Sequence, residues 1–263
     1  MSGFSSGFGP GVASAFGPPT AGGGSPASRW VLDLSTDYAN LKTSAPAGLA
    51  VTEPTSGSID SASISSGELI LSMGSTAGAS FNGTGGYGAP RVEFRSTRGL
   101  TDTLEIRGKF RNGQTGGGGS FPGVGIFACK DADAPGADRS WMNSRTNGTH
   151  ALFWETGNSA VSVKSITTSQ RDTTGVWVRF LIGSMGGIQG YYSVDTTSDP
   201  DSVTWTKWAY GRQTGASWYF TESEGGPEQT IRFGLAVGMD TSNSTSQIGR
   251  LMYLDCNIRP IGA

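Results

Sequence analysis

The sequence predicts an all-β protein, an antiparallel β-sandwich preceded by an extended arm rich in Gly, Phe and Pro. Glycine makes up 42 of the 263 residues, more than twice its usual share of about 7%, which disfavours long helices. Short apolar runs with period-two alternation recur between turns rich in Gly, Ser, Thr and Asp. No apolar stripe with helical spacing extends over several turns, so no crossover helices of a parallel sheet are expected.

Residues 1–28 form the arm and differ from the rest of the chain. They contain no charged side chain and are dense in Gly and Pro, which cannot sustain a helix or a central strand. Three aromatic residues, Phe4, Phe8 and Phe16, are spaced along this segment. We predict a docking arm that becomes ordered on a partner, with these phenylalanines as its anchors. A disordered tail whose phenylalanines have no role is the alternative. No secretory signal is recognised, because no apolar stretch precedes Arg29, the first charged residue.

Residues 29–263 are predicted to form one jelly-roll domain. In segment 103–110, Leu104 and Ile106 alternate with charged residues that include Arg107 and Lys109, which indicates one buried and one solvated face. The expected strands, in chain order, are Glu68–Met73, Arg91–Ser96, Thr103–Phe110, Gly123–Cys129, Ala151–Glu155, Val161–Ile166, Val176–Ile182, Gln189–Val194, Val203–Trp208, Thr230–Val237 and Arg250–Ile258.

Charge and hydropathy exclude two classes of partner. The formal net charge is −2 and the basic residues are scattered, whereas a nucleic-acid-binding protein needs a basic stripe. The best apolar run, Val176–Ile182, is interrupted by Arg179 and is too short to cross a membrane. Only 15% of the residues are charged, so apolar and Gly-rich surface is expected to be covered by homo-oligomerisation.

The sequence gives little indication of a metal site or of redox-active cysteines. The two cysteines, Cys129 and Cys256, form no CxxC pair, and His150 is the single histidine, which nearly excludes a zinc site. Both cysteines are interpreted as small buried thiols, and a disulfide between them is left open. No cofactor is predicted. A Ca²⁺ site in the acidic segment 131–138 is a weak alternative to a solvated turn, with the candidate ligands Asp131, Asp133 and Asp138.

No catalytic residue is predicted, and the protein is not expected to be an enzyme. A glycosidase needs two carboxylates that face the scissile bond. The nearest groupings of acidic residues, in 131–138, 195–201 and 222–228, lie beside Gly, Pro or Ser, and Glu155 is interpreted as a lone acid inside an apolar run. His150 has no nucleophile motif near it.

Aromatic residues in or beside turn-rich stretches are the remaining signal. Their flat side chains are suited to stack on sugar rings or to contact a neighbouring subunit. The alternative is that most of them anchor the core or the strand edges. The candidate contact residues are Trp141, Trp205, Trp208, Tyr210, Trp218 and Tyr219.

Three segments resemble the concanavalin A-like lectin/glucanase jelly roll, including its laminin-G-like relatives. They are 103–110 followed by 123–128, then 176–180 followed by 188–193 and 205–208, and finally 249–258. The resemblance implies a β-sandwich but leaves the function open, because this fold includes lectins, hydrolases and structural modules. Enzymes of the family carry an E-x-D-x-x-E run on one strand, and this chain has none.

The arm resembles the N-terminal segments of tailed-bacteriophage virion proteins. This resemblance implies a non-enzymatic structural protein located in the virion, as a capsid decoration, head-fibre or tail-associated protein, with other virion proteins as partners. The alternative function is a carbohydrate-binding module for host or environmental glycans, which is compatible with the first. A glycoside hydrolase is the third hypothesis.

Overall fold

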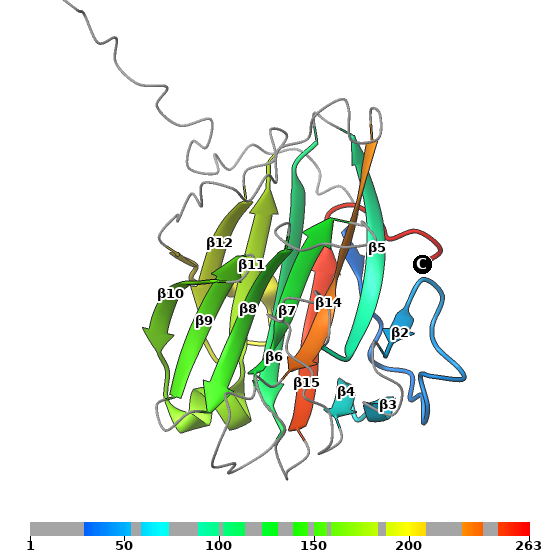
Figure 1. Cartoon of the computed structure of the whole chain (residues 1–263), viewed down its shortest axis with the longest axis horizontal. Coiled ribbons are helices and arrows are strands. Elements are labelled where there is room, and N and C mark those ends of the chain that lie inside the picture. The colour runs from blue at the N-terminus through cyan, green and yellow to red at the C-terminus, as the bar shows by residue number, and fades with distance from the viewer. Residues whose placement is uncertain are drawn as a thin grey trace, which may run out of the picture.

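Two antiparallel β-sheets lie face to face, one behind the other in Figure 1, with the main hydrophobic core between them. The structure, a computed structural model, describes residues 29–53, 59–73, 89–99, 102–113, 123–130, 139–146, 150–156, 159–183, 188–208, 228–238 and 247–263. This part of the chain confirms the predicted antiparallel jelly-roll sandwich. The arm, with Phe4, Phe8 and Phe16, lies outside the described residues.

The first sheet is eight-stranded in the described part of the chain. Its strands are β1 (Trp30–Val31), β3 (Ile59–Ser65), β4 (Glu68–Met73), β6 (Leu104–Asn112), β11 (Val176–Ile182), β12 (Ile188–Ser193), β13 (Thr206–Lys207) and β15 (Gln247–Cys256). Their spatial order is β13-β12-β11-β6-β15-β4-β3, and β1 pairs with the end of β15. Strands that are distant in the sequence, such as β6 and β15, are therefore direct neighbours.

The second sheet has seven strands within the described ranges. They are β2 (Ala50–Thr52), β5 (Arg91–Gly99), β7 (Gly123–Lys130), β8 (Arg139–Thr146), β9 (His150–Thr156), β10 (Ser159–Ser165) and β14 (Glu228–Gly238), in the order β10-β9-β8-β7-β14-β5-β2. Two helical turns, η1 (Gln170–Thr174) and η2 (Pro200–Ser202), lie between strands. None of the helices among the described residues has the length and apolar character that a membrane crossing requires.

The predicted strands Glu68–Met73 and Val176–Ile182 are confirmed to the residue. The predicted strand Val203–Trp208 is wrong in extent, because only Thr206–Lys207 pair with β12 and the residues before them follow the turn η2. Four strands were not predicted, namely β1, β2, β3 and β8. Strand β8 is rich in polar residues and lacks a clear apolar alternation, yet β7 and β9 pair with it on both sides.

The two sheets interlock where glycines of the eight-stranded sheet receive large side chains of the other sheet. A Cβ atom added at Gly108 would lie 2.2 Å from Cδ1 of Ile126, and one added at Gly190 would lie 2.3 Å from Cε of Met142. Any larger residue at these positions would overfill a close-packed interior. The glycine content of the strands is thus in part a packing requirement and not only a source of turns.

Both cysteines are buried thiols, as predicted, and they form no disulfide with each other. Cys256 lies near Ser96 between the sheets, and burial raises the pKa of its thiol to about 11. Cys129 belongs to a second apolar cluster with Phe127 and Trp141. A thiol with a raised pKa in an apolar environment is a poor nucleophile, so neither the burial nor the pKa of Cys256 suggests a reactive site.

Candidate functional site

A row of polar side chains crosses the outer face of the eight-stranded sheet. Lys207 of β13 is opposite Tyr191 of β12, and Tyr191 is opposite Arg179 of β11. Arg179 is opposite Arg107 of β6, which in turn is opposite Asp255 of β15. Directly opposing residues of an antiparallel pair share one face of the sheet. The strand register therefore gathers residues from distant parts of the sequence into one strip.

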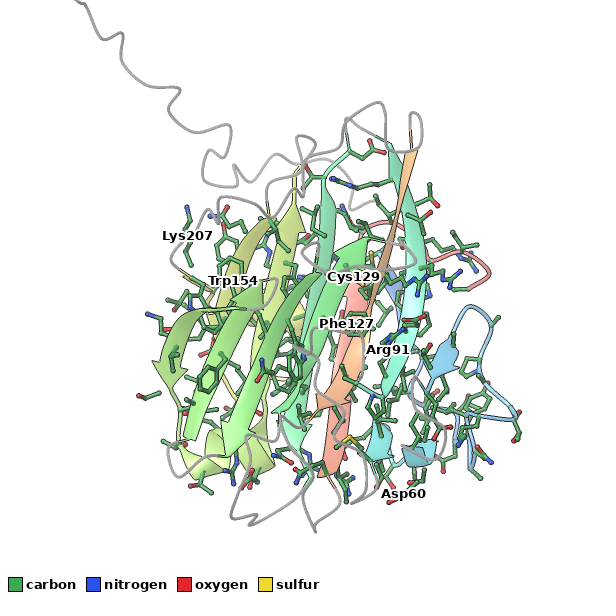
Figure 2. All side chains as sticks on the ribbon, viewed as in Figure 1. Asp60, Arg91, Phe127, Cys129, Trp154 and Lys207 are labelled. Carbon is green, nitrogen blue, oxygen red and sulfur yellow. The ribbon has the colours of Figure 1, made fainter. Side chains whose placement is uncertain are left out.

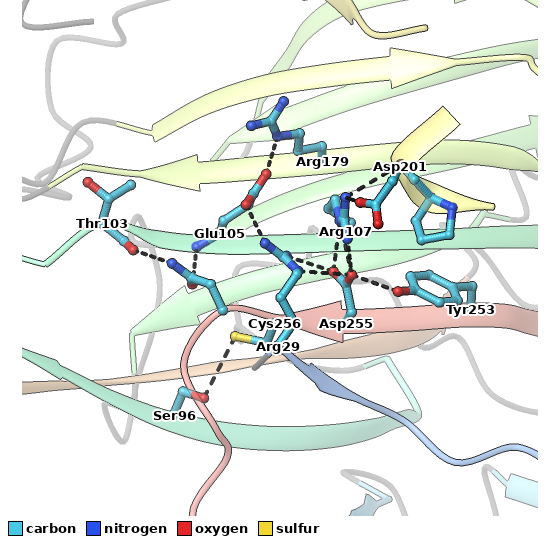
Figure 3. A network of polar contacts seen from close by, with 12 residues as sticks. Arg29, Ser96, Thr103, Glu105, Arg107, Arg179, Asp201, Tyr253, Asp255 and Cys256 are labelled. Carbon is cyan, nitrogen blue, oxygen red and sulfur yellow. Dashed lines mark hydrogen bonds and ion pairs between the residues drawn. The ribbon is translucent and has the colours of Figure 1, made fainter. Parts of the chain in front are cut away.

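Arg29, the first residue after the arm, connects the strip to the N-terminal end of the sandwich. Its guanidinium donates hydrogen bonds to both carboxylate oxygens of Asp255, at 3.0 and 2.8 Å, and to Glu105 at 2.5 Å. Glu105 also forms an ion pair with Nε of Arg179 at 2.5 Å (Figure 3). Strand β1 places Arg29 here, because Trp30 and Val31 pair with Cys256 and Asp255.

Arg107 extends the contacts on the other side of Asp255. It donates to both oxygens of Asp255 and forms an ion pair of 2.7 Å with Asp201 in η2. The hydroxyl of Tyr253 donates a further hydrogen bond of 2.7 Å to Asp255. These contacts form an alternating chain of opposite charges, called here the ion-pair chain, which runs through Arg179, Glu105, Arg29, Asp255, Arg107 and Asp201.

Asp255 is the buried centre of the ion-pair chain, with a side chain that is 0% exposed. Burial alone would raise the pKa of Asp255, but hydrogen bonds from Arg107, Arg29 and Tyr253 outweigh it and hold the pKa below its ordinary value. The pKa of Tyr253 is raised by burial and by its hydrogen bond to this carboxylate. Asp255 is therefore a fixed negative charge, whereas a glycosidase acid needs a carboxyl whose pKa is raised.

The predicted solvated face of β6 is wrong for two of its residues. Arg107 is 7% and Lys109 is 4% exposed. The amine of Lys109 donates to the backbone carbonyls of Thr196 and Thr197 and lies 5.3 Å from the ring centre of Trp177. The segment between β12 and β13 thus covers this part of the sheet with backbone acceptors, which compensate the buried positive charge.

Two partly exposed aromatic rings lie close to Arg179 at the β12–β13 end of the strip. The guanidinium carbon of Arg179 lies 5.1 Å from the ring centre of Tyr191 and 5.7 Å from that of Trp205. Both rings are partly exposed, and Trp205 also packs edge to face against the buried Trp177 at 6.3 Å. Lys207 lies beside Tyr191 and is exposed. We call these four residues the aromatic–arginine patch, which consists of Tyr191, Arg179, Trp205 and Lys207.

The structure separates the predicted contact aromatics. Trp205 is partly exposed, and its contact role stays a prediction. The prediction of surface contact is wrong for Trp141 and Trp208, which are 3% and 0% exposed. Trp141 lies in β8 with Phe127 in an apolar cluster, and Trp208 packs in the core. The other candidates lie outside the described residues, which applies to Tyr210, Trp218 and Tyr219 and to the acidic residues Asp131, Asp133 and Asp138.

Sequence reasoning missed Arg179, Tyr191 and Lys207 as members of one site. A usable signal was Arg179 inside an apolar strand, two positions after Trp177 and thus on the same face. The pairing of β11 with β12 and of β12 with β13 was not readable from the sequence, and it is this pairing that assembles the patch.

A second set of charged groups lies on the outer face of the seven-stranded sheet. Arg91 and Glu93 of β5 are 4% and 2% exposed and form an ion pair at 2.7 Å, and Arg232 of β14 lies 3.8 Å from Glu93. Arg91 and Phe127 are labelled on this sheet in Figure 2. Arg91 and Glu93 are buried, Arg232 is partly buried, and the three charges pair with one another, so they are interpreted as structural.

Two sets of candidates remain, namely residues that could bind a metal ion and the acidic residue Glu155. Within the residues that the structure describes, no group of three or more His, Cys, Asp or Glu side chains is arranged to hold a metal ion. Glu155 lies in β9, but its side chain is outside the described part, so the prediction that it has no catalytic role stays a prediction.

Comparisons with known proteins give structural likenesses only. No family model and no curated protein sequence matches this chain. The carbohydrate recognition domain of Emp47p has a TM-score of 0.44 and 12% identity, over 89% of this chain and 98% of that chain. Winged bean acidic lectin has a TM-score of 0.48 and 11% identity, over 84% and 97% of the two chains. The alginate lyase AlgAT5 of polysaccharide lyase family 7 has a TM-score of 0.45 and 14% identity, over 80% and 93%. The likeness concerns the arrangement of strands and assigns no activity to this chain.

Proposed function

We propose that this protein is a non-enzymatic carbohydrate-binding module whose sugar site is the aromatic–arginine patch. The observation that carries the proposal is the placement of two partly exposed aromatic rings, Trp205 and Tyr191, with ring centres 5.7 and 5.1 Å from the guanidinium carbon of Arg179. Flat aromatic faces suit the apolar faces of sugar rings, and a few well-placed polar groups beside them provide orientation. The rigid strands β11 and β12 hold two of these residues in register.

The chemistry of the neighbouring carboxylates supports binding over catalysis. Asp255 accepts hydrogen bonds from two guanidinium groups and a tyrosine hydroxyl, and its pKa is lowered. Glu105 is ion-paired with Arg29 and Arg179. Carboxylates held in this way are structural charges that stabilise the surface beside the patch, and the lowered pKa of Asp255 makes it unsuited to act as a general acid near neutral pH.

Replacing Trp205 with alanine is expected to weaken sugar binding at least tenfold, because a central aromatic anchor accounts for much of the binding energy of a small site. The wild-type chain is first screened on an array of neutral and acidic glycans, and the affinity for the best ligand is then measured by titration calorimetry. Tyr38→Ala, which removes a partly exposed aromatic beside β3, is the matched control and should keep the wild-type affinity. An array without a ligand, or equal affinity of the Trp205 variant, contradicts the proposal.

We propose as a second function that residues 1–28 attach the module to a virus particle as a structural component. The composition of the arm supports this proposal. The contacts of Arg29 also support it, since they tie the first residue after the arm to Asp255 and Glu105 in the body of the sandwich. Arg29, where the arm joins the sandwich, is therefore fixed to strands β15 and β6 of the eight-stranded sheet.

A chain that begins at Arg29 is expected to unfold at the same denaturant concentration as the full chain but to lose association with the particle. The measurement compares incorporation of the two forms into purified virions by sedimentation and immunoblotting. The variant with Phe4, Phe8 and Phe16 all replaced by serine keeps the length of the arm and tests whether the aromatic anchors matter. Equal incorporation of the truncated and full-length forms would contradict the proposal that the arm attaches the module to the particle.

A further inference from the structure

We propose that the ligand of the aromatic–arginine patch is an acidic glycan, held by a sugar carboxylate between Arg179 and Lys207. This inference rests on the proposed carbohydrate-binding function and adds the chemical class of the ligand. Three features of the strip support it, namely the fixed orientation of Arg179, the position of Lys207 in the same row, and the excess of unused hydrogen-bond donors over acceptors.

Arg179 is oriented before any ligand arrives. Its Nε lies 2.5 Å from Glu105, and its guanidinium carbon lies 5.1 Å from the ring centre of Tyr191 and 5.7 Å from that of Trp205. The two terminal nitrogens point away from Glu105 in Figure 3, and they have no hydrogen-bond partner in the part of the chain that the structure describes. The planar fork of a guanidinium matches the two oxygens of a carboxylate. The edge that remains open on Arg179 is thus the one that binds a carboxylate in a bidentate manner.

Lys207 supplies a second positive charge in the same row. It is opposite Tyr191, which is opposite Arg179, so the two cations are two strand spacings apart on one face. Two spacings amount to about 10 Å between Cα atoms, a separation that two long side chains can bridge through a shared anion. Lys207 is exposed, forms no ion pair with any described residue, and lies at the outer margin of the molecule in Figure 2.

The carboxylates around the strip already have partners. Asp195 accepts from the backbone N–H of Thr204, Asp199 accepts at the start of η2, and Asp201 pairs with Arg107. Among the described residues, none of these three carboxylates pairs with the terminal nitrogens of Arg179 or with Lys207. Neutral hydroxyls satisfy such donors weakly, whereas a carboxylate gives shorter and stronger charge-assisted hydrogen bonds. The rings of Trp205 and Tyr191 favour a sugar as the carrier of this carboxylate.

The test compares oligosaccharides of galacturonate and glucuronate with their carboxyl-reduced, neutral counterparts of the same length, by titration calorimetry on the full chain. We expect the acidic form to bind about tenfold more tightly, the effect of a charge-assisted contact. Lys207→Gln should remove most of this difference, because it weakens binding of the acidic form much more than binding of the neutral form. Arg179→Lys keeps the charge beside Glu105 but removes the fork, and it should also reduce the preference.

The controls separate this inference from the proposed function. Lys164→Gln removes a lysine of β10 in the other sheet and should bind both forms as the wild type does. Equal binding of acidic and neutral forms by the wild type, or an unchanged preference in Lys207→Gln, overturns the acidic ligand while sugar binding stands. A sulfated glycan or another class as the only ligand on the array also overturns it. If no glycan binds, the proposed function fails and this inference with it.

Discussion

Asp255→Asn is expected to lower the free energy of unfolding by about 3–5 kcal/mol, the usual effect of removing one partner from a buried ion pair. The Asp255 carboxylate is fully buried and accepts hydrogen bonds from Arg29, Arg107 and Tyr253. An asparagine keeps the shape but carries no charge, so Arg107, which is 7% exposed, loses its main compensation. Urea unfolding followed by tryptophan fluorescence measures the difference.

Asp201→Asn is the matched control at the exposed end of the same ion-pair chain. Its side chain is 79% exposed, and pairs of this kind contribute about 0–1 kcal/mol. The two variants remove the same chemical group from the same arginine and differ in burial. If both variants lost the same small amount of stability, the ion-pair chain would be a solvated surface feature and not a buried support for the site.

The pH dependence of unfolding gives a second measure of the same carboxylate. The pKa of Asp255 is lower in the folded than in the unfolded protein, so its stabilising effect is present above the unfolded value of about 3.9 and is lost as the pH falls below it. The Asp255→Asn variant should show a shallower loss of stability in acid. A remaining slope is expected from Glu68, whose pKa is lowered by hydrogen bonds from Arg111 and Arg250 that outweigh its burial.

Alternation of apolar residues predicts strands well where one face meets the core, and β4 and β11 have the predicted bounds. The same rule fails for the outer face of β6, where Arg107 and Lys109 are buried. Their covering groups come from distant segments, since Asp255 is 148 residues from Arg107 in the sequence. Local periodicity reports which residues share a face, but it carries no information on what packs over that face.

The sequence predicted that aromatic residues form the candidate site, but not which aromatic residues belong to it. Trp205 and Trp208 are separated by two residues of the same short segment, and both were candidates for surface contact. The pairing of Thr206 and Lys207 with β12 places Trp205 outside, and Trp208 then enters the core. A pattern of two strand residues is too short to define a face, so this distinction needed the register.

Trp208→Ala is expected to lower the free energy of unfolding by about 3–5 kcal/mol, as for other fully buried tryptophans replaced by alanine. Trp208 is 0% exposed, packs against Trp154 and Tyr192 at ring distances of 5.9 and 5.2 Å, and donates its backbone N–H to Gly190. Because these contacts fix β13 to the sheet, the variant should also bind sugar more weakly through loss of the position of Lys207. Urea unfolding and calorimetric titration measure the two effects.

Two further variants separate the structural from the binding role of these tryptophans. Trp208→Phe keeps most of the aromatic area and removes an indole N–H that has no hydrogen-bond partner among the described residues, so it should lose clearly less stability than the alanine variant. Trp205→Ala, at the surface, should lose affinity with a change in stability below about 1 kcal/mol. If Trp205→Ala destabilised the fold as much as Trp208→Ala, Trp205 would be a core anchor and the aromatic–arginine patch would lose its central ring. From the register of β13 we expect Trp208→Ala to lose more stability than Trp205→Ala, and Trp205→Ala to lose more affinity than Trp208→Ala.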